Sequence, residues 1–265
     1  MRLLKPLLSF FIALSIISCS SSDDSSSNTN VPFNLPLSDG NFWTYDVVGQ
    51  NGNSRDSLYV ANDTLINGKT YKKFKTEQLP SGFYSSSLNN NGVIYENGKL
   101  LLTGDLDLAS GQALPVNLDL SVIDFVIFDK NANNGAALNS NPKTGNIQQT
   151  YNGIPLNINY DLNTYAGETL QSFTSPDGTT YNNVKVTQVK LNMTISATYA
   201  GVTIPNILTN PQVMVSTVYT ADGIGMVYTN TDITVNLNSL VATQLGVDPN
   251  STQNQQEFLD TYQVN

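Results

Sequence analysis

The chain has 265 residues, no histidine and a single cysteine, and its 21 acidic against 12 basic residues give a formal net charge of −9. The lack of histidine argues against Ser-His-Asp and Cys-His catalytic groups and against histidine-ligated zinc, and one cysteine excludes an internal disulfide and a cysteine-ligated metal cluster. The only arginines are Arg2 and Arg55, which argues against a nucleic-acid groove or a phosphate clamp. We therefore expect no metal, no cofactor, no nucleic-acid partner and no enzymatic activity.

The first 19 residues have the organisation of an export signal. Arg2 and Lys5 form a short basic region, and residues 7–17 form an apolar run that is shorter than the roughly 20 residues needed to span a bilayer. Residues 16–19 read Ile-Ile-Ser-Cys, and this ending resembles the lipobox of bacterial lipoproteins. The alternative is an ordinary secretory signal that happens to contain a cysteine.

The resemblance implies that residues 1–18 are a lipoprotein signal peptide and that Cys19 becomes the acylated first residue of the mature protein. Residues 20–30 contain no apolar side chain, so residues 19–30 are predicted to be a disordered tether attached to the lipid. Acyl chains hold a protein to a membrane because each buried CH₂ group contributes roughly 0.8 kcal/mol. A membrane is therefore the expected partner of the N-terminus.

The residues that follow Cys19 bear on location. Ser20 stands where an aspartate would resemble the inner-membrane retention signal of Gram-negative lipoproteins, so the serine indicates the outer membrane. Ser22, Asp23 and Asp24 are similar to a short acidic signal that sends some lipoproteins to the cell surface. The alternative is that this acidic pair belongs to a solvated linker, which leaves the periplasmic and the surface side both open.

The rest of the chain is rich in the turn signals of β-hairpins. Asn-Gly or Asp-Gly dipeptides recur from residue 39 to residue 223, and they supply the positive φ angles that tight hairpin turns require. The clearest hairpins are predicted at Asn67-Gly68 and Asn97-Gly98, each of which separates two alternating segments. These signals predict an antiparallel sheet.

Apolar and polar residues alternate along several of the predicted strands, so each has one buried face. The alternation changes phase near Gln188 and near Ile123, which predicts β-bulges at Thr187–Gln188 and Val122–Ile123. The apolar faces that could be either core or ligand-facing comprise Leu156, Ile158, Tyr160, Leu191, Met193 and Ile195. Trp43, the only tryptophan, belongs to the same group because it could either plug the core or stack on a ligand.

We predict an all-β fold with few short helices, in which residues 31–265 form one domain built on a strongly curved antiparallel sheet or half-barrel. Residues 239–245, which are followed by Gly246, are expected to form one or two helical turns. Residues 252–262 are expected to form a short C-terminal helical segment, because Thr252 and Gln255 have capping-box spacing. The alternative for that segment is a frayed polar tail.

Three stretches carry a resemblance to a known group of proteins. Residues 36–48 include Gly-Asn-Phe-Trp-Thr-Tyr, residues 67–71 continue a hairpin, and residues 218–227 end in Gly-Ile-Gly-Met-Val. Together they resemble an uncharacterised family of secreted lipoproteins whose curved antiparallel half-barrel is similar in plan to lipoprotein-carrier and lipocalin-like folds. The resemblance implies a fold and supplies no functional residues.

Other candidate sites are weak. Asp105 and Asp107 fall on one strand face about 7 Å apart, which could suit paired-carboxylate chemistry but also fits the solvated face of a strand. Residues 129–135 have oxygen-bearing side chains at alternate positions like a calcium loop, but the glycine is one position late and Ser140 stands where the glutamate belongs, so the alternative is a polar loop. Residues 223–225 are more typical of a tight turn than of a phosphate-binding loop.

The expected function is therefore that of a non-enzymatic, lipid-anchored lipoprotein of the cell envelope. Its concave sheet would either hold a lipophilic small molecule or present a surface to another envelope protein. The alternatives are a surface-exposed glycan-binding or adhesion module, which clustered exposed aromatic residues would favour, and a hydrolase that uses carboxylates alone. An open sheet interior would favour a carrier, and an interior filled by side chains would argue against one.

Overall fold

The computed structural model describes residues 33–50, 52–108, 119–199 and 201–265. The expectations for Cys19, Ser22, Asp23 and Asp24, and for the signal peptide and tether, lie outside the described residues. Among the described residues, no helix is both long and apolar enough to cross a membrane.

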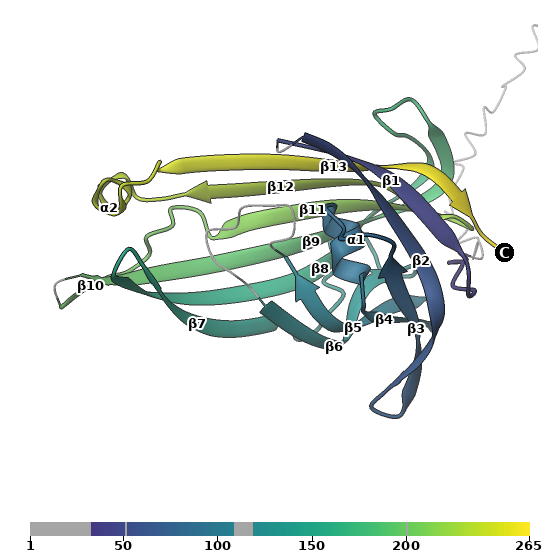
Figure 1. The fold of residues 1–265 in the computed structure, drawn as a ribbon, viewed down its shortest axis with the longest axis horizontal. Helices are drawn as coiled ribbons and strands as arrows, with labels where there is room; N and C mark the ends of the chain where they lie inside the picture. Colours follow the sequence, from purple (N-terminus) through teal and green to yellow (C-terminus); the bar gives the residue numbers. More distant parts are fainter. Residues whose placement is uncertain (1–32, 51, 109–118, 200) are drawn as a thin grey trace, which may run out of the picture. The chain divides into compact units, whose positions relative to one another are not determined.

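The described part of the chain from residue 33 onward is dominated by one antiparallel sheet (Figure 1). Its strands follow the order β6-β5-β4-β3-β2-β1-β13-β12-β11-β9-β8-β7, and β10 pairs with β9. The strands are β1 (Phe42–Gly49), β2 (Gly52–Ile66), β3 (Lys69–Thr76), β4 (Gly92–Glu96), β5 (Lys99–Asp107), β6 (Asp119–Asp129), β7 (Lys143–Tyr151), β8 (Ile154–Thr174), β9 (Thr180–Tyr199), β10 (Val202–Ile204), β11 (Gln212–Ala221), β12 (Gly225–Asn236) and β13 (Asn250–Gln263). The two helices among the described residues are α1 (Phe83–Leu88) and α2 (Ser239–Leu245).

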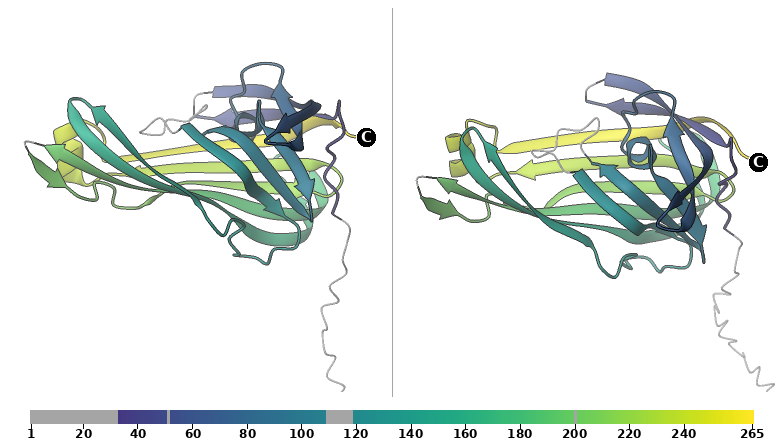
Figure 2. Two further views of the ribbon diagram at one scale, coloured as in Figure 1. Left: turned by 90° about the horizontal axis from the view of Figure 1, so that it is seen from below. Right: turned by 60° about the horizontal axis from the view of Figure 1, so that its bottom comes forward.

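The sheet is strongly curved, which confirms the predicted all-β class. Figure 2 shows the β1–β6 half curling round until it faces the long strands β8, β9 and β11–β13, so the sheet almost closes into a barrel. The long strands run on past this barrel towards α2 and β10 (Figure 1). At one end the sheet is therefore closed further than a half-barrel, and at the other end, where the long strands extend towards α2 and β10, it remains open.

Tight turns form where the sequence places them. Asn67 and Gly68 have φ angles of 51° and 82° between β2 and β3, and Asn97 and Gly98 have φ angles of 53° and 81° between β4 and β5. Two successive positive φ angles are those of a type I′ turn, whose twist matches that of the flanking strands. Both predicted hairpins are confirmed.

One of the two predicted bulges is confirmed. In β6 the register against β5 shifts between Val122 and Phe125, Asp124 has a φ of 49°, and Ile123 points outwards. The bulge predicted at Thr187–Gln188 is wrong, because both residues keep a continuous register with β8 and β11. Here the irregularity lies in β8 between Ala166 and Thr169, and the phase changes because both faces of β9 are covered at this level.

The predicted C-terminal helix is wrong. Residues 250–263 form β13, which pairs with β1 on one side and with β12 on the other. Gln255, Glu257 and Leu259 point inwards at the strand period of two. Strands β1 and β12 supply hydrogen-bond partners for the β13 backbone on its two sides. The predicted helix at residues 239–245 is confirmed as α2, capped by the Asn238 side chain and ended by Gly246 in the left-handed conformation.

The connection between β6 and β7, residues 130–142, bridges the gap where the barrel would otherwise stay open. Leu138 N donates a 2.8 Å hydrogen bond to Thr164 O of β8. On the other side, Val126 N of β6 donates to Asn139 Oδ1 at 2.8 Å, and Asn139 Nδ2 donates to Val126 O at 3.0 Å. One asparagine side chain thus takes the place of a strand partner for β6 and completes the barrel wall.

Helix α1 lies inside the curve of the sheet (Figures 1 and 2). It belongs to the β3–β4 connection, and all of its residues except Tyr84 are buried, including Ser85, Ser86 and Ser87. A single core cluster extends from α1 and the barrel wall to the long strands. The barrel interior is therefore largely filled by a helix.

Candidate functional site

The two strand faces predicted to be core or ligand-facing come together as core. Ile158 and Tyr160 of β8 pair with Ile195 and Met193 of β9, and Leu191 pairs with Leu162 one step further along. Tyr160 is half-buried, and the other named residues, together with Leu156, are buried. They pack against one another in the extended core and border none of the open space described next.

An apolar cavity of about 70 Å³ lies in the barrel end of the sheet. Its wall consists mainly of leucine and aromatic side chains, most of them from α1, β1–β3, β5 and β6. On the opposite side β9, β11 and β12 contribute valine, threonine, methionine and glycine. Residues Leu35, Pro36 and Leu37, which precede β1, also border it. We refer to this cavity as the chamber.

Trp43 is the one predicted site residue that borders the chamber. Its indole Nε1 donates to Ile224 O at 2.6 Å, and its ring stacks on Phe74 with 6.2 Å between centroids. Sequence reasoning missed the contribution of Phe83 and Leu88, because the intervening serines favour turns and caps over a buried helix. The turn at residues 223–225 forms as expected, with Gly225 beside the Trp43 ring.

Buried side chains from distant strands hold the start of α1. Gly82 N donates to Asp56 Oδ2 at 2.7 Å, Phe83 N to Gln255 Oε1 at 2.8 Å, and Tyr84 N to Glu257 Oε1 at 2.7 Å. The first N–H groups of a helix have no partner within the helix and carry partial positive charge, so carboxylate and amide oxygens stabilise them. These contacts fix α1 against β2 and β13 at the edge of the chamber.

Glu257 is a fully enclosed carboxyl group, with 1 % of its surface exposed. Burial raises the pKa of Glu257 to about 7, and the nearby charge of Asp56 acts in the same direction, while the N–H groups of Tyr84 and Ser85 oppose the shift. Asp56 and Glu257 converge on Gly82, since a Cβ placed there would overlap Glu257 Oε2 and approach Asp56 Oδ2 to 2.9 Å. Their oxygens accept hydrogen bonds from the α1 backbone, which is a capping role.

The other weak candidates give no assembled site in the described part of the chain. Asp105 is exposed on β5, as expected for the solvated face of a strand. Asp129 accepts a hydrogen bond from Asn131 N and lies 3.7 Å from the Lys99 ammonium group. No group of three or more potential metal-binding carboxylates, cysteines or histidines occurs among the described residues.

Six polar side chains border the chamber, and half of them form hydrogen bonds. Besides Trp43, Tyr45 donates its hydroxyl to Met226 O at 3.3 Å and Ser87 donates to Phe83 O at 2.7 Å. The remaining three hydroxyl groups border the chamber without a hydrogen-bond partner among the described residues: Tyr84, Thr187 and Thr220. Burial, and the neighbouring Glu257, hold the pKa of Tyr84 well above its ordinary range, so this hydroxyl stays protonated.

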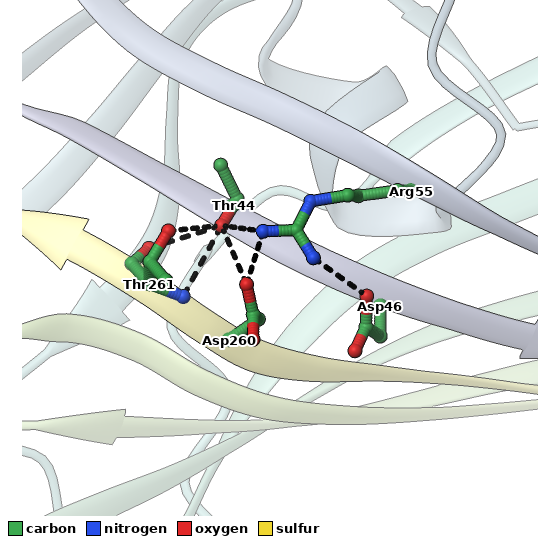
Figure 3. A network of polar contacts seen from close by, with 5 residues as sticks. All are labelled: Thr44, Asp46, Arg55, Asp260 and Thr261. Atoms are coloured by element: carbon green, nitrogen blue, oxygen red, sulfur yellow. Dashed lines mark hydrogen bonds and ion pairs between the residues drawn. The ribbon is translucent and has the colours of Figure 1, made fainter.

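The outer face of the barrel carries a polar network around Arg55 (Figure 3). Arg55 of β2 lies 3.2 Å from Asp46 of β1 and forms a close ion pair with Asp260 of β13. Thr44 and Thr261 complete the network through their hydroxyl groups (Figure 3). These contacts tie three neighbouring strands together, and because the charges are largely exposed they contribute at most about 1 kcal/mol.

A cluster of aromatic rings bears on the glycan-binding alternative. Phe173 stacks on Tyr219 with 4.1 Å between centroids, and Tyr228 contacts both Tyr219 and Phe258 at 5.4 and 5.2 Å. Only 6 % of the Tyr228 surface is exposed, and the other three rings are half-buried. The ring faces are covered by one another, so the cluster packs the end of β8 onto β11–β13.

No protein-family model, no curated protein and no solved structure matches the chain. The resemblance to a family of secreted lipoproteins therefore stays a prediction. The curved antiparallel sheet that this resemblance implies is confirmed, and it closes further than the expected half-barrel (Figure 2).

Proposed function

We propose that the protein is a non-enzymatic, lipid-anchored lipoprotein of the outer membrane that binds one small, largely apolar molecule in the chamber. The observation that carries this proposal is a partly open apolar space whose wall is mainly leucine and aromatic side chains. Apolar cavities of this kind stay dry and take up apolar guests, because water finds no partners in them.

The size of the chamber restricts the ligand. A volume of about 70 Å³ exceeds the roughly 10–15 Å³ needed for one water molecule and falls far below the roughly 300 Å³ at which sites for drug-sized ligands begin. The ligand is therefore about the size of a single ring or a short chain. The proposed site also differs from the concave faces of β8 and β9, whose apolar residues pack into the core.

The hydrogen bonding of the carboxyl groups near the chamber supports a binding role over catalysis. Asp56 and Glu257 are the only carboxyl groups that converge near the chamber in the described part of the chain, and both are hydrogen-bonded to the start of α1. A general acid or base needs a free oxygen within hydrogen-bond reach of the reacting group. In this arrangement the carboxyl groups position a helix.

Toluene binding to the purified protein, measured by calorimetry and by amide chemical shifts, tests the proposal. We expect saturable binding that is lost in Val218→Phe, because Val218 borders the chamber and a phenyl ring there occupies the space. Val215→Phe is the matched control, since Val215 lies on the same strand with the opposite orientation and does not border the chamber.

Circular dichroism checks that both variants fold. The proposal fails if toluene does not bind saturably to the unaltered protein. It fails equally if folded Val218→Phe binds toluene as well as the unaltered protein does.

A further inference from the structure

We infer that the molecule held in the chamber is a small neutral amphiphile, such as an alcohol or a phenol, whose hydrogen-bonding end meets Thr187 and Thr220. This inference rests on the proposed function and names the ligand chemistry of the same site. It is carried by unpartnered hydroxyl groups at one wall of an otherwise apolar space.

The two threonines are neighbours on that wall. Thr187 of β9 pairs with Val218 of β11, and Thr220 is two residues further along β11 on the same side. Diagonal neighbours of this kind have Cα atoms about 7–8 Å apart, within reach of one polar group placed between them. One end of a single ligand can therefore contact both hydroxyl groups.

Both threonines are deeply buried, with 2 % of Thr187 and 6 % of Thr220 exposed. Neither hydroxyl has a hydrogen-bond partner among the described residues, although each can donate one bond and accept two. A buried polar group without a partner is unfavourable, so a ligand that supplies the partner gains affinity over one that does not. Of the other polar side chains at the chamber, Trp43, Tyr45 and Ser87 already have partners within the protein. The third hydroxyl group without a partner in the described part of the chain, that of Tyr84, belongs to α1 and not to the wall formed by β9 and β11.

The ligand's polar end is neutral because the chamber offers no charge to pair with. No aspartate, glutamate, lysine or arginine borders the chamber among the described residues. A buried ion without a counter-charge is far more costly than a buried hydroxyl group. The carboxyl groups of Asp56 and Glu257, which hold the start of α1, would further disfavour an anionic end such as a carboxylate. The ammonium group of Lys185, the strand partner of Thr220, already donates to Ala132 O and Thr169 Oγ1 and does not border the chamber.

Phenol and toluene test the inference because they have nearly the same size and shape and differ in one hydroxyl group. In the unaltered protein we expect phenol to bind more tightly than toluene once the affinity of each compound is corrected for its free energy of transfer out of water. In Thr187→Val/Thr220→Val, which keeps the side-chain volume, we expect a five- to ten-fold loss of phenol affinity and no loss of toluene affinity. Each single valine variant is measured as well, so that a folding defect in the double variant does not stop the test.

Thr217→Val is the matched control. Thr217 lies on β11 next to Val218, the strand partner of Thr187, but faces outwards, where Gln188 Nε2 approaches its hydroxyl at 3.5 Å. We expect it to change the affinity for neither compound.

The outcomes separate the two proposals. If toluene binds in the chamber but folded valine variants hold phenol as well as the unaltered protein does, the inference about ligand chemistry is overturned and the proposed function stands. If neither compound binds to the unaltered protein, the proposed function fails and the inference fails with it.

Discussion

Glu257 is a buried carboxyl group whose surroundings differ strongly from water. Its pKa rises from 4.5 to about 7 on folding, so between these pH values the folded protein holds a proton that the unfolded chain has released. Stability therefore decreases as pH rises through this interval, by up to about 3 kcal/mol, and this contribution is constant above it. The chain has no histidine, so few other side chains titrate in the same range.

Denaturant unfolding at pH 5 and pH 8 measures this effect. We expect Glu257→Gln to remove most of the difference between the two pH values, because glutamine keeps an acceptor for Tyr84 N and cannot ionise. Glu77→Gln is the control, since Glu77 is exposed. A difference that persists unchanged in Glu257→Gln would show that other groups cause it.

For single residues, the sequence predicts the local backbone conformation but not the contacts between residues far apart in the chain. Asn67 and Gly68 show their turn in the residue types alone, because positive φ is a local property. Glu257 and its partner Tyr84 are 173 residues apart, and no local pattern marks them as a pair. The sequence marks Thr187 only as part of a predicted β-bulge, whereas its place at the chamber depends on contacts with distant strands.

Helix α1 fills much of the barrel interior, and Gly82, which precedes it, packs closely against the carboxyl groups of Glu257 and Asp56. The φ of Gly82 is −74°, which any residue adopts, so an added methyl group acts only through space. That methyl group would overlap Glu257 Oε2 and displace a carboxyl group that holds the α1 backbone. We expect Gly82→Ala to destabilise the protein by about 1–3 kcal/mol through the lost hydrogen bonds.

Thermal unfolding and amide hydrogen exchange of Tyr84 and Ser85 measure this loss. Gly49→Ala is the control, because a Cβ at Gly49 meets its nearest atom at an ordinary 3.7 Å. Equal melting temperatures and equal exchange in the two variants would mean that the contacts at Gly82 do not hold α1.

The elements themselves show which patterns can be trusted. Strands with strict alternation, such as β8, were predicted because one face is core and the other is solvated. Residues 252–262 were assigned to a helix because Thr252 and Gln255 mimic a cap, and the inward alternation of Gln255 and Glu257 was hidden by their polarity. Polar residues that face inwards defeat a prediction based on hydrophobic periodicity.

At the scale of the whole molecule, the lipid anchor remains a prediction from residues 16–19. Cys19→Ser should release the protein from membranes, because the serine cannot carry the thioether-linked acyl chains that hold it there. Membrane fractionation and the mass of the N-terminal peptide measure this. Ser26→Ala in the tether should change neither, and a Cys19→Ser protein that stays with washed membranes would contradict the anchor.

The single curved sheet was foreseeable because hairpin turns and one-sided strands recur along the chain. Its near closure was not, because it depends on Asn139 meeting Val126 and on residues 130–142 covering β8, contacts with no signature in the sequence. The filling of the interior by α1 was missed for the same reason. The predicted carrier surface consequently became core, and the open space lies elsewhere.

The position of β13 has a consequence for how the chain acquires its structure. Strands β1–β6 and β7–β12 are two separate runs of neighbouring strands, and β13 lies between β1 and β12. Strand β13, which follows both runs in the sequence, is therefore the one that joins them and brings Gln255 and Glu257 to α1. The chamber takes its wall from both runs, so it can form only after β13 has paired with β1 and with β12.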